Sequence, residues 1–332
     1  NPGARKSITC DIIEFGATAR DIHCERTPSL RGAKRRAIHP SGYAARWIAS
    51  PRIFDPRIYM LTKTPHLFDE ATAVTAGDSR WQGRTSPDYW AFVGPFGGCT
   101  AATILRALMQ HPQRAGDPLA LTVNYCAPVA EGVFDLDVRL VKANRSSQHW
   151  SVEMTQGGGE VTTLATAVFA ERRPSWSHQP AQFPGAVPFE QLRPYPKLAM
   201  TWPNQYDFRF AEGEPKFAGG GGAKVPSSPY SKLWIADRVP RKLDALSLMS
   251  MSDAFFGRVF HARHELVPFG TVSLTTYFHA DAADLDAEDT TRVLATADAK
   301  TFHKSYGDQH GELWSPSGRL LATTTQIAYF KA

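Results

Sequence analysis

One stretch of sequence decides the fold: residues 94–112, GPFGGCTAATILRALMQHP. Its first five residues are typical of a turn. The apolar residues that follow have the i, i+3, i+4, i+7, i+8 spacing of one helix face, at Ala101, Ile104, Leu105, Leu108 and Met109. The pair His111-Pro112 ends the pattern, because proline cannot continue a helix. The stretch therefore predicts a helix with one strongly apolar face.

Strand patterns follow this helix. Four candidates lie at residues 120–125, 134–143, 148–156 and 161–172. Turn residues separate the last three, with Asn, Arg and Ser at residues 144–147 and three glycines at residues 157–159. The first half of the chain therefore predicts one helix followed by a run of antiparallel strands.

The second half of the chain repeats this order. A strand is expected at residues 230–237 and a helix at residues 245–260, with its apolar residues in helical register. Four strands are expected after it, at residues 271–279, 292–302, 305–315 and 320–330. The tripeptide Leu164-Ala165-Thr166 is echoed by Leu321-Ala322-Thr323. These matches indicate an internal duplication.

An apolar helix followed by amphipathic strands packs well when a curved antiparallel sheet wraps the helix, which is the hotdog arrangement. Two copies predict an α+β double hotdog, with domains at residues 60–173 and 230–332. Side-by-side pairing of the two sheets would hide strand edges that a single copy exposes. Residues 174–229, rich in Pro and Gly, are interpreted as a linker with some local structure, and residues 1–59 as a disordered or non-native extension.

The composition excludes several classes of protein. The formal net charge is +5, but eleven Lys/Arg and only five Asp/Glu lie in residues 1–59, so the predicted domains are nearly neutral and do not suggest a nucleic-acid partner. No apolar run is long enough to predict a membrane span, and no secretory signal is expected. The four cysteines form no CxxC pair, which disfavours a metal site or a disulfide framework and favours a reducing, cytoplasmic location.

Asp253 is the most conspicuous polar residue in the second predicted helix. It lies four residues after Met249 and three before Phe256, so a continuous helix would place its carboxylate on the apolar face. A buried carboxylate is costly unless it is paired or used, and burial raises its pKa toward that of a general base. A carboxylate at the edge of the apolar stripe, bonded to backbone, is the alternative.

Three short motifs carry a resemblance: Ser250-Met251-Ser252-Asp253, Gly270-Thr271-Val272-Ser273 and Thr323-Thr324-Thr325-Gln326. With them, residues 246–329 resemble the C-terminal hotdog of the type II acyl-CoA thioesterases. Residues 90–173 resemble the N-terminal hotdog of the thioesterase-like superfamily. The resemblance implies an enzyme of lipid and fatty acid metabolism that hydrolyses acyl-CoA without a cofactor.

The resemblance also implies site residues. Asp253 would be the general base, while the Thr271 hydroxyl and the Gln326 carbonyl oxygen would hold the attacking water. Gly97 and Gly98 would help form the substrate pocket, and the turn with Arg145 and Ser146 would lie near coenzyme A. The chain departs from the family at Ser273 and Leu274, where acidic and His residues are frequent, and at Cys99, where Gln is frequent.

Other interpretations remain open from the sequence. A hotdog enoyl-CoA hydratase or dehydratase would need an Asp and a His a few residues apart, and Arg258 lies at that distance from Asp253. A non-catalytic acyl-CoA binding protein would keep the pocket without the water-holding residues. Cys99 as a nucleophile would require a base and a lowered pKa. The histidines show no ligand spacing, so no metal is expected, and association of copies into a homo-oligomer is left open.

Overall fold

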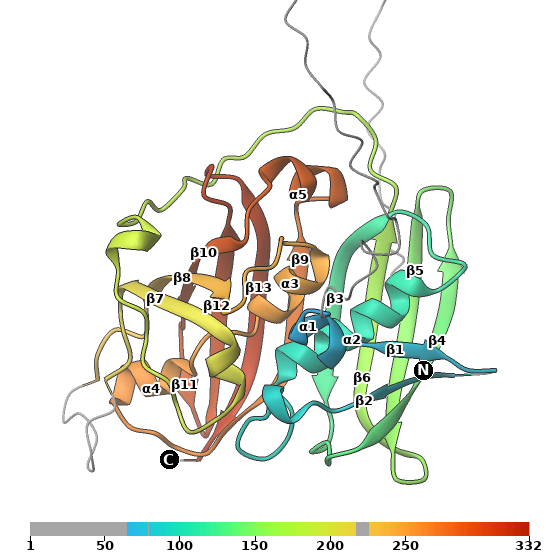
Figure 1. Cartoon of the computed structure of the whole chain (residues 1–332), viewed down its shortest axis with the longest axis horizontal. Helices are drawn as coiled ribbons and strands as arrows, with labels where there is room; N and C mark the ends of the chain where they lie inside the picture. Colours follow the sequence, from blue (N-terminus) through green and yellow to red (C-terminus); the bar gives the residue numbers. More distant parts are fainter. Residues whose placement is uncertain (1–64, 79, 217–225, 332) are drawn as a thin grey trace, which may run out of the picture. The chain divides into compact units, whose positions relative to one another are not determined.

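The computed structural model describes residues 65–78, 80–216 and 226–331 (Figure 1). Predicted features in residues 1–59, with Cys10 and Cys24, lie outside the described residues. The elements of the first half are α1 (Leu67–Ala71), β1 (Val74–Ala76), β2 (Trp81–Arg84), η1 (Pro87–Tyr89), α2 (Gly97–Gln110), β3 (Asp117–Tyr125), β4 (Val133–Ala143), β5 (Ser147–Gln156) and β6 (Glu160–Ala170).

The second half begins with two short 3-10 turns and a strand that precede its own helix. Its elements are η2 (Phe189–Gln191), η3 (Trp202–Gln205), β7 (Tyr206–Glu212), β8 (Ser231–Asp237), α3 (Ala245–Met251), α4 (Arg258–Arg263), β9 (Phe269–Phe278), α5 (Ala282–Glu288), β10 (Arg292–Asp298), β11 (Phe302–His303), β12 (Tyr306–Trp314) and β13 (Leu320–Phe330). In the described part of the chain, no helix is long and apolar enough to cross a membrane.

All of these strands belong to one antiparallel sheet. The order is β1-β2-β4-β5-β6-β3-β9-β13-β12-β10-β8-β7, with β11 attached to β12. The two halves meet where β3 pairs with β9, and the hydroxyls of Thr122 and Thr275 hydrogen bond across this join at 2.9 Å. Arg172 adds donors to the carbonyls of Phe278 and His279. The expected side-by-side pairing of two hotdog sheets is confirmed.

The helices α2 and α3 cover one face of this sheet and pack against each other (Figure 1). In α2, Ala101, Ile104, Leu105 and Leu108 of the predicted stripe are fully inaccessible, and Met109 is partly buried. Alternate strand residues point away from the helices, and on that face Trp234, Leu294 and Trp314 form a second, smaller apolar cluster. The predicted α+β double hotdog is therefore the observed architecture.

The predicted helix over residues 245–260 is wrong in its middle. The structure ends α3 at Met251 and begins α4 at Arg258. The Ser252 hydroxyl donates to the carbonyl of Met249, and the amide of Asp253 bonds to the carbonyl of Ser250, three residues back. These tight contacts replace the i to i−4 helical bonds and turn the chain. Asp253 thus lies in a turn after α3 and not on a helix face.

Two further expectations differ from the structure. The strand expected over residues 292–302 ends at Asp298, and Phe302–His303 form the separate strand β11. In residues 174–229, where only local structure was expected, β7 pairs along β8 as an edge strand of the sheet. The alternation in β7 was obscured by the surrounding Pro and Gly residues.

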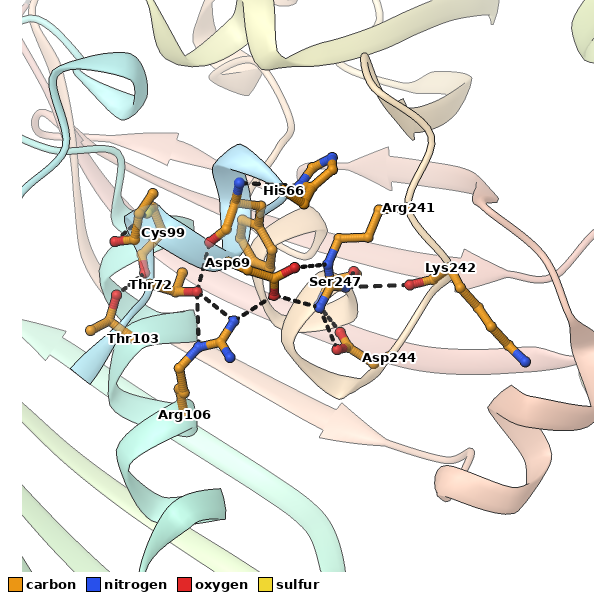
Figure 2. Close-up of polar contacts among 12 residues, drawn as sticks. His66, Asp69, Thr72, Cys99, Thr103, Arg106, Arg241, Lys242, Asp244 and Ser247 are labelled. Atoms are coloured by element: carbon orange, nitrogen blue, oxygen red, sulfur yellow. Dashed lines mark hydrogen bonds and ion pairs between the residues drawn. The ribbon is translucent and has the colours of Figure 1, made fainter. Parts of the chain in front are cut away.

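A partly exposed ionic network connects the helices of the two halves (Figure 2). Asp69 of α1 binds Arg106 of α2 at 2.8 Å and Arg241 at 2.9 Å. Arg241 also binds Asp244, the N-cap of α3, at 2.7 Å, and donates to Ser247. Burial would raise the pKa of Asp69, but hydrogen bonds from Arg241 and Arg106 lower it below its ordinary value. The network therefore ties α2, through Arg106, and the start of α3, through Arg241 and Asp244, to α1.

We expect the two halves to unfold as one cooperative unit, because β3 and β9 share a buried core. Leu274 on β9 is fully buried, so Leu274→Ala should lower the free energy of unfolding by about 2–5 kcal/mol. Hydrogen exchange of β5, in the first half, should accelerate as much as exchange of β12. The exposed control Val141→Ala should change neither strand, and unchanged protection of β5 in Leu274→Ala would contradict cooperativity.

Candidate active site

The three residues predicted to act together are in contact. The Gln326 amide Nε2 donates to Asp253 Oδ1 at 2.9 Å, and the Thr271 hydroxyl donates to Gln326 Oε1 at 3.3 Å. Asp253 and Gln326 are only 7% and 4% exposed. A carboxylate, an amide and a hydroxyl therefore form one continuous hydrogen-bonded chain inside the second half.

Strand geometry places Gln326 and Thr271 on the same face of the sheet. Gln326 lies on β13 between the buried residues Thr324 and Ala328, which point toward the helices. On β9 the ladder skips Val272, so that Ser273 pairs with Ile327 and Thr271 pairs with Ala328. This bulge shifts the alternation by one residue and turns Thr271 toward the interior. Without it, Thr271 would face away from Gln326.

The first half contributes the N-terminal turn of α2 to the same site. The Gly98 amide N–H hydrogen bonds to the Asp253 carboxylate. A Cβ on Gly97 would lie 2.8 Å from Asp253 Oδ2, and one on Gly98 would lie 2.5 Å from the Ser250 carbonyl oxygen. Only glycine permits this approach of α2 to the turn after α3. The site is thus shared between the two halves.

Tyr125, at the end of β3, belongs to the site but was not singled out from the sequence. Its hydroxyl donates to the carbonyl of Gly97 at 2.8 Å and would lie 3.0 Å from a Cβ at that position. Burial, followed by the nearby Asp253 charge, raises the pKa of Tyr125 well above its ordinary value, so the hydroxyl keeps its proton. A tyrosine at a strand end was the only sequence signal, and many structural tyrosines share it.

The electrostatic state of Asp253 is unusual. Burial raises the pKa of its carboxyl to about 7, and the hydrogen bonds from Gln326 and the Gly98 amide counteract this only in part. A carboxyl group with this pKa exchanges a proton near neutral pH. The turn after α3 therefore presents a group suited to general-base chemistry.

The structure does not bring Arg145 and Ser146 into this site. Their turn joins β4 to β5, next to Ala170, which pairs with Asp117 at the start of β3. Tyr125 is at the other end of β3, about 25 Å away at the usual rise of a strand. Both residues are exposed. Their contact with substrate remains a prediction.

The two described cysteines do not resemble nucleophiles. Burial raises the pKa of the Cys99 thiol to about 12, and its sulfur lies 4.0 Å from the Ala71 carbonyl oxygen. Cys126 is exposed and free. In residues 65–78, 80–216 and 226–331, no three His, Cys, Asp or Glu side chains are arranged to hold a metal ion.

One small groove reaches Gln326. Its lining includes Arg258 and Val259 of α4, Phe269 of β9, Gln309 of β12 and Phe330 of β13. A larger cavity, of about 110 Å³, lies between α5 and the start of α3, where none of the three predicted catalytic residues is present. We therefore take the smaller groove as the one connected with the site, since it contains Gln326.

Comparison with known families and structures agrees with this geometry. The family description "Acyl-CoA thioesterase N-terminal domain" matches residues 86–170, and "Acyl-CoA thioesterase C-terminal domain" matches residues 175–330. A conserved hotdog-fold protein of unknown function from Alicyclobacillus acidocaldarius is 41% identical, with a TM-score of 0.76 over 81% of this chain and 99% of that chain. Comparison with curated proteins gave no match.

Two structures of lower identity share the fold. The acyl-CoA thioesterase II TesB2 from Mycobacterium marinum is 16% identical, with a TM-score of 0.62 over 80% of this chain and 98% of that chain. A tesB protein from Mycobacterium avium subs paratuberculosis is 18% identical, with a TM-score of 0.64 over the same shares, 80% and 98%. At these identities the likeness concerns the fold alone.

The close approach of α2 to Ser250 leads to a stability prediction. Gly98→Ala should lower the free energy of unfolding by about 1–3 kcal/mol, because the new methyl group would meet a backbone carbonyl that cannot move away freely. Gly270→Ala is the control, since a Cβ there meets nothing within 4 Å. Chemical denaturation measures both. Equal stabilities of the two variants would show that the α2 contact is looser than described.

Proposed function

Because the chain belongs to the acyl-CoA thioesterase family, with both family domains matched between residues 86 and 330, we propose that it hydrolyses the thioester bond of an acyl-CoA. The products would be the free acid and coenzyme A. The observation that carries the proposal is the contact of Asp253, Gln326 and Thr271 beside the N-terminal turn of α2. No other cluster in the described residues combines a buried base with a water-holding set.

In the proposed reaction, water attacks the thioester carbonyl carbon while Asp253 takes one of its protons. The tetrahedral intermediate then collapses, the carbon–sulfur bond breaks, and the departing thiolate receives that proton from Asp253, which is ionised again. The acid and the thiol are the only products, so no covalent acyl-enzyme is needed. Positioning the water and the base in one site supplies the rate enhancement expected of preorganised groups.

The hydrogen-bond pattern supports distinct roles for the side chains. A carboxylate only accepts, so Gln326 must turn its NH₂ group toward Asp253 and its carbonyl oxygen toward Thr271. Asp253 Oδ2 then remains to accept from the water. The Gln326 carbonyl oxygen and the lone pairs of Thr271 accept its second hydrogen.

The thioester carbonyl oxygen needs donors as negative charge develops on it. The first turn of α2 lies beside Asp253, at the positive end of the helix dipole. Its Gly98 N–H binds the Asp253 carboxylate and its Cys99 and Thr100 N–H groups bind the Phe96 carbonyl, so the Gly97 N–H is the backbone donor proposed for the thioester oxygen. Tyr125 binds the Gly97 carbonyl and thereby fixes that turn. We propose that Gly97 and Gly98 form the substrate-binding wall.

The alternative reaction, that of an enoyl-CoA hydratase or dehydratase, has less support from the geometry than thioester hydrolysis. His261 donates from Nδ1 to the carbonyl of Gly213 and accepts from Arg258, so it is engaged away from Asp253. Burial and the Arg258 charge lower its pKa to about 2, which keeps the ring neutral. An acid–base pair of Asp253 with this histidine is therefore not present.

The first functional prediction concerns Asp253. Asp253→Asn keeps the shape but removes the base, so kcat for the best acyl-CoA should fall by about 10²–10⁴-fold. Thr271→Ala and Gln326→Ala should each cost less, because each contributes one hydrogen bond to the water. Release of the CoA thiol measures turnover.

Asp237→Asn is the matched control for this substitution. Asp237 is also buried, with a pKa raised to about 7 mainly by burial, but it lies at the end of β8 without a hydrogen bond to any site residue. Its replacement should leave turnover within a few-fold. Near-normal turnover in Asp253→Asn together with loss of activity in Cys99→Ser would favour a covalent mechanism.

The second functional prediction concerns pH. Asp253 accepts a proton only when ionised, so kcat/KM should rise with pH and level off above about 7, with a slope near tenfold per pH unit on the acid side. The Asp237→Asn variant should show the same rise of kcat/KM with pH below about 7. A profile that is flat between pH 5 and 8 would exclude Asp253 as the base.

The same pKa shift affects stability. Since the folded-state pKa lies above the ordinary carboxyl value of 3.8, the native state binds this proton more tightly than the unfolded chain does. The contribution of Asp253 to stability is therefore present at low pH and lost as pH rises from about 4 to about 7. Denaturation of Asp253→Asn should show a smaller loss across this window than the wild type.

A further inference from the structure

Two polar side chains from different halves of the chain meet at Gly97. The Tyr125 hydroxyl, at the end of β3, donates to the Gly97 carbonyl oxygen at 2.8 Å. A Cβ on Gly97 would lie 3.0 Å from this hydroxyl and 2.8 Å from Asp253 Oδ2, in the turn after α3. The missing side chain therefore lets the hydroxyl and the carboxylate approach the same piece of backbone.

A single peptide group lies between these two side chains. Its carbonyl, on Gly97, accepts from Tyr125, and its N–H, on Gly98, donates to the Asp253 carboxylate. The oxygen and the N–H of a planar peptide are conjugated, so a donor at the oxygen polarises the group and makes the N–H a stronger donor. A hydrogen-bonded chain therefore runs from the Tyr125 hydroxyl through the peptide to the Asp253 carboxylate.

The start of α2 does not hold this peptide in place by itself. The N-cap residue is Phe96, whose side chain makes no hydrogen bond to the first turn. The helix begins with Gly97 and Gly98, and glycine has the greatest backbone freedom. The Phe96 carbonyl accepts from the two amides that follow this peptide. The orientation of the Gly97–Gly98 peptide therefore depends on Tyr125 at one edge and on Asp253 at the other.

Other ionisable groups near the turn do not set the charge state of Asp253. Burial raises the pKa of Tyr125 well above its ordinary value and the pKa of the Cys99 thiol to about 12, so both keep their protons. On α4, Arg258 lowers the pKa of His261, which stays neutral, and does not shift that of Asp253. The inward-facing residues of β9 and β13 do not ionise. The pKa of Asp253 is therefore set by burial, which raises it, against two hydrogen bonds, one of them from this peptide.

Building on the thioester hydrolysis proposed above, we propose that Tyr125 is a positioning residue for the general base: its hydroxyl fixes the Gly97–Gly98 peptide, which in turn holds its N–H against the Asp253 carboxylate. In this role Tyr125 touches neither the attacking water nor the thioester. It stabilises the ionised form of Asp253, the form that takes a proton from water, and so extends activity toward lower pH.

The Tyr125→Phe variant tests this role, because it removes one hydroxyl and keeps the ring. The Gly98 N–H should then bind the carboxylate more weakly, so the midpoint of the Asp253 titration should move up by about 0.3–0.7 pH unit. Carbon-13 NMR of the aspartate carboxyl groups measures this midpoint, with the Asp253 signal identified by its loss in Asp253→Asn. An unchanged midpoint in Tyr125→Phe would overturn the proposal.

Tyr89→Phe is the matched control. Tyr89 is also a buried tyrosine of the first half, and in the described part of the chain its hydroxyl is hydrogen bonded to none of the site residues. Its replacement should leave the midpoint of Asp253 where it is in the wild type. Equal shifts in the two variants would show that losing any buried hydroxyl of the first half perturbs Asp253, and the specific role of Tyr125 would be lost.

The Gly98 amide proton reports the step between the two side chains. In the wild type its resonance should move downfield as Asp253 ionises, since a hydrogen bond to a charged acceptor is shorter and stronger. In Tyr125→Phe this movement should be smaller, because the peptide is less polarised and less firmly oriented. A movement of wild-type size would mean that Tyr125 does not act through the peptide, contrary to the proposal.

Kinetics separate this proposal from the hydrolysis on which it rests. The kcat/KM of Tyr125→Phe should fall about two- to fivefold at about pH 5.5 and return toward the wild-type value at about pH 8.5, because a higher midpoint matters only on the acid side. A loss by the same factor at both pH values would place Tyr125 on the substrate and exclude the positioning role. If the wild type hydrolyses no acyl-CoA, the thioesterase function fails, while the two NMR titrations still decide whether Tyr125 acts on Asp253.

Discussion

The pairing of β3 with β9 is the constraint on which the rest of the structure depends. It joins two sheets that would otherwise each expose an edge, and it brings the helices of the two halves into contact. Only because of this contact does the N-terminal turn of α2 reach the turn after α3, where Gly98 meets Asp253. Tyr125 and Thr271 are on the two joined strands themselves. Neither half alone contains the complete site.

The duplication does not produce the same site twice. Both halves have a bulge at the corresponding place, since β3 skips Leu119 opposite β6 as β9 skips Val272 opposite β13. This equivalence puts Pro118 in the position of Thr271. It also puts Ala167, opposite Leu121, in the position of Gln326, opposite Leu274. The equivalent place in the first half thus lacks both the hydroxyl of Thr271 and the amide of Gln326.

Sequence patterns predicted most elements and the three central site residues, but not how local geometry brings the residues together. The stripe of α2 and the alternation of the strands are local signals that survive packing. The break after Met251 and the bulge at Val272 depend on hydrogen bonds to other segments, so no single-strand pattern reveals them. Asp253 was found because a carboxylate among apolar residues is informative even when the predicted helix is wrong. Tyr125 and Gln309 carry no such contrast with their neighbours.

Two buried charges of opposite sign explain why the paired glutamines differ in role. The Asp253 carboxylate can only accept, so it draws the NH₂ group of Gln326 and leaves the carbonyl oxygen for Thr271. The Arg258 guanidinium can only donate, so it draws the carbonyl oxygen of Gln309 and turns the NH₂ group away. Identical side chains in register on adjacent strands are thus fixed in opposite orientations. Burial of each charge lowers the stability of the fold. Each charge also fixes the orientation of one glutamine amide, so that the amide presents a defined acceptor or donor beside the groove.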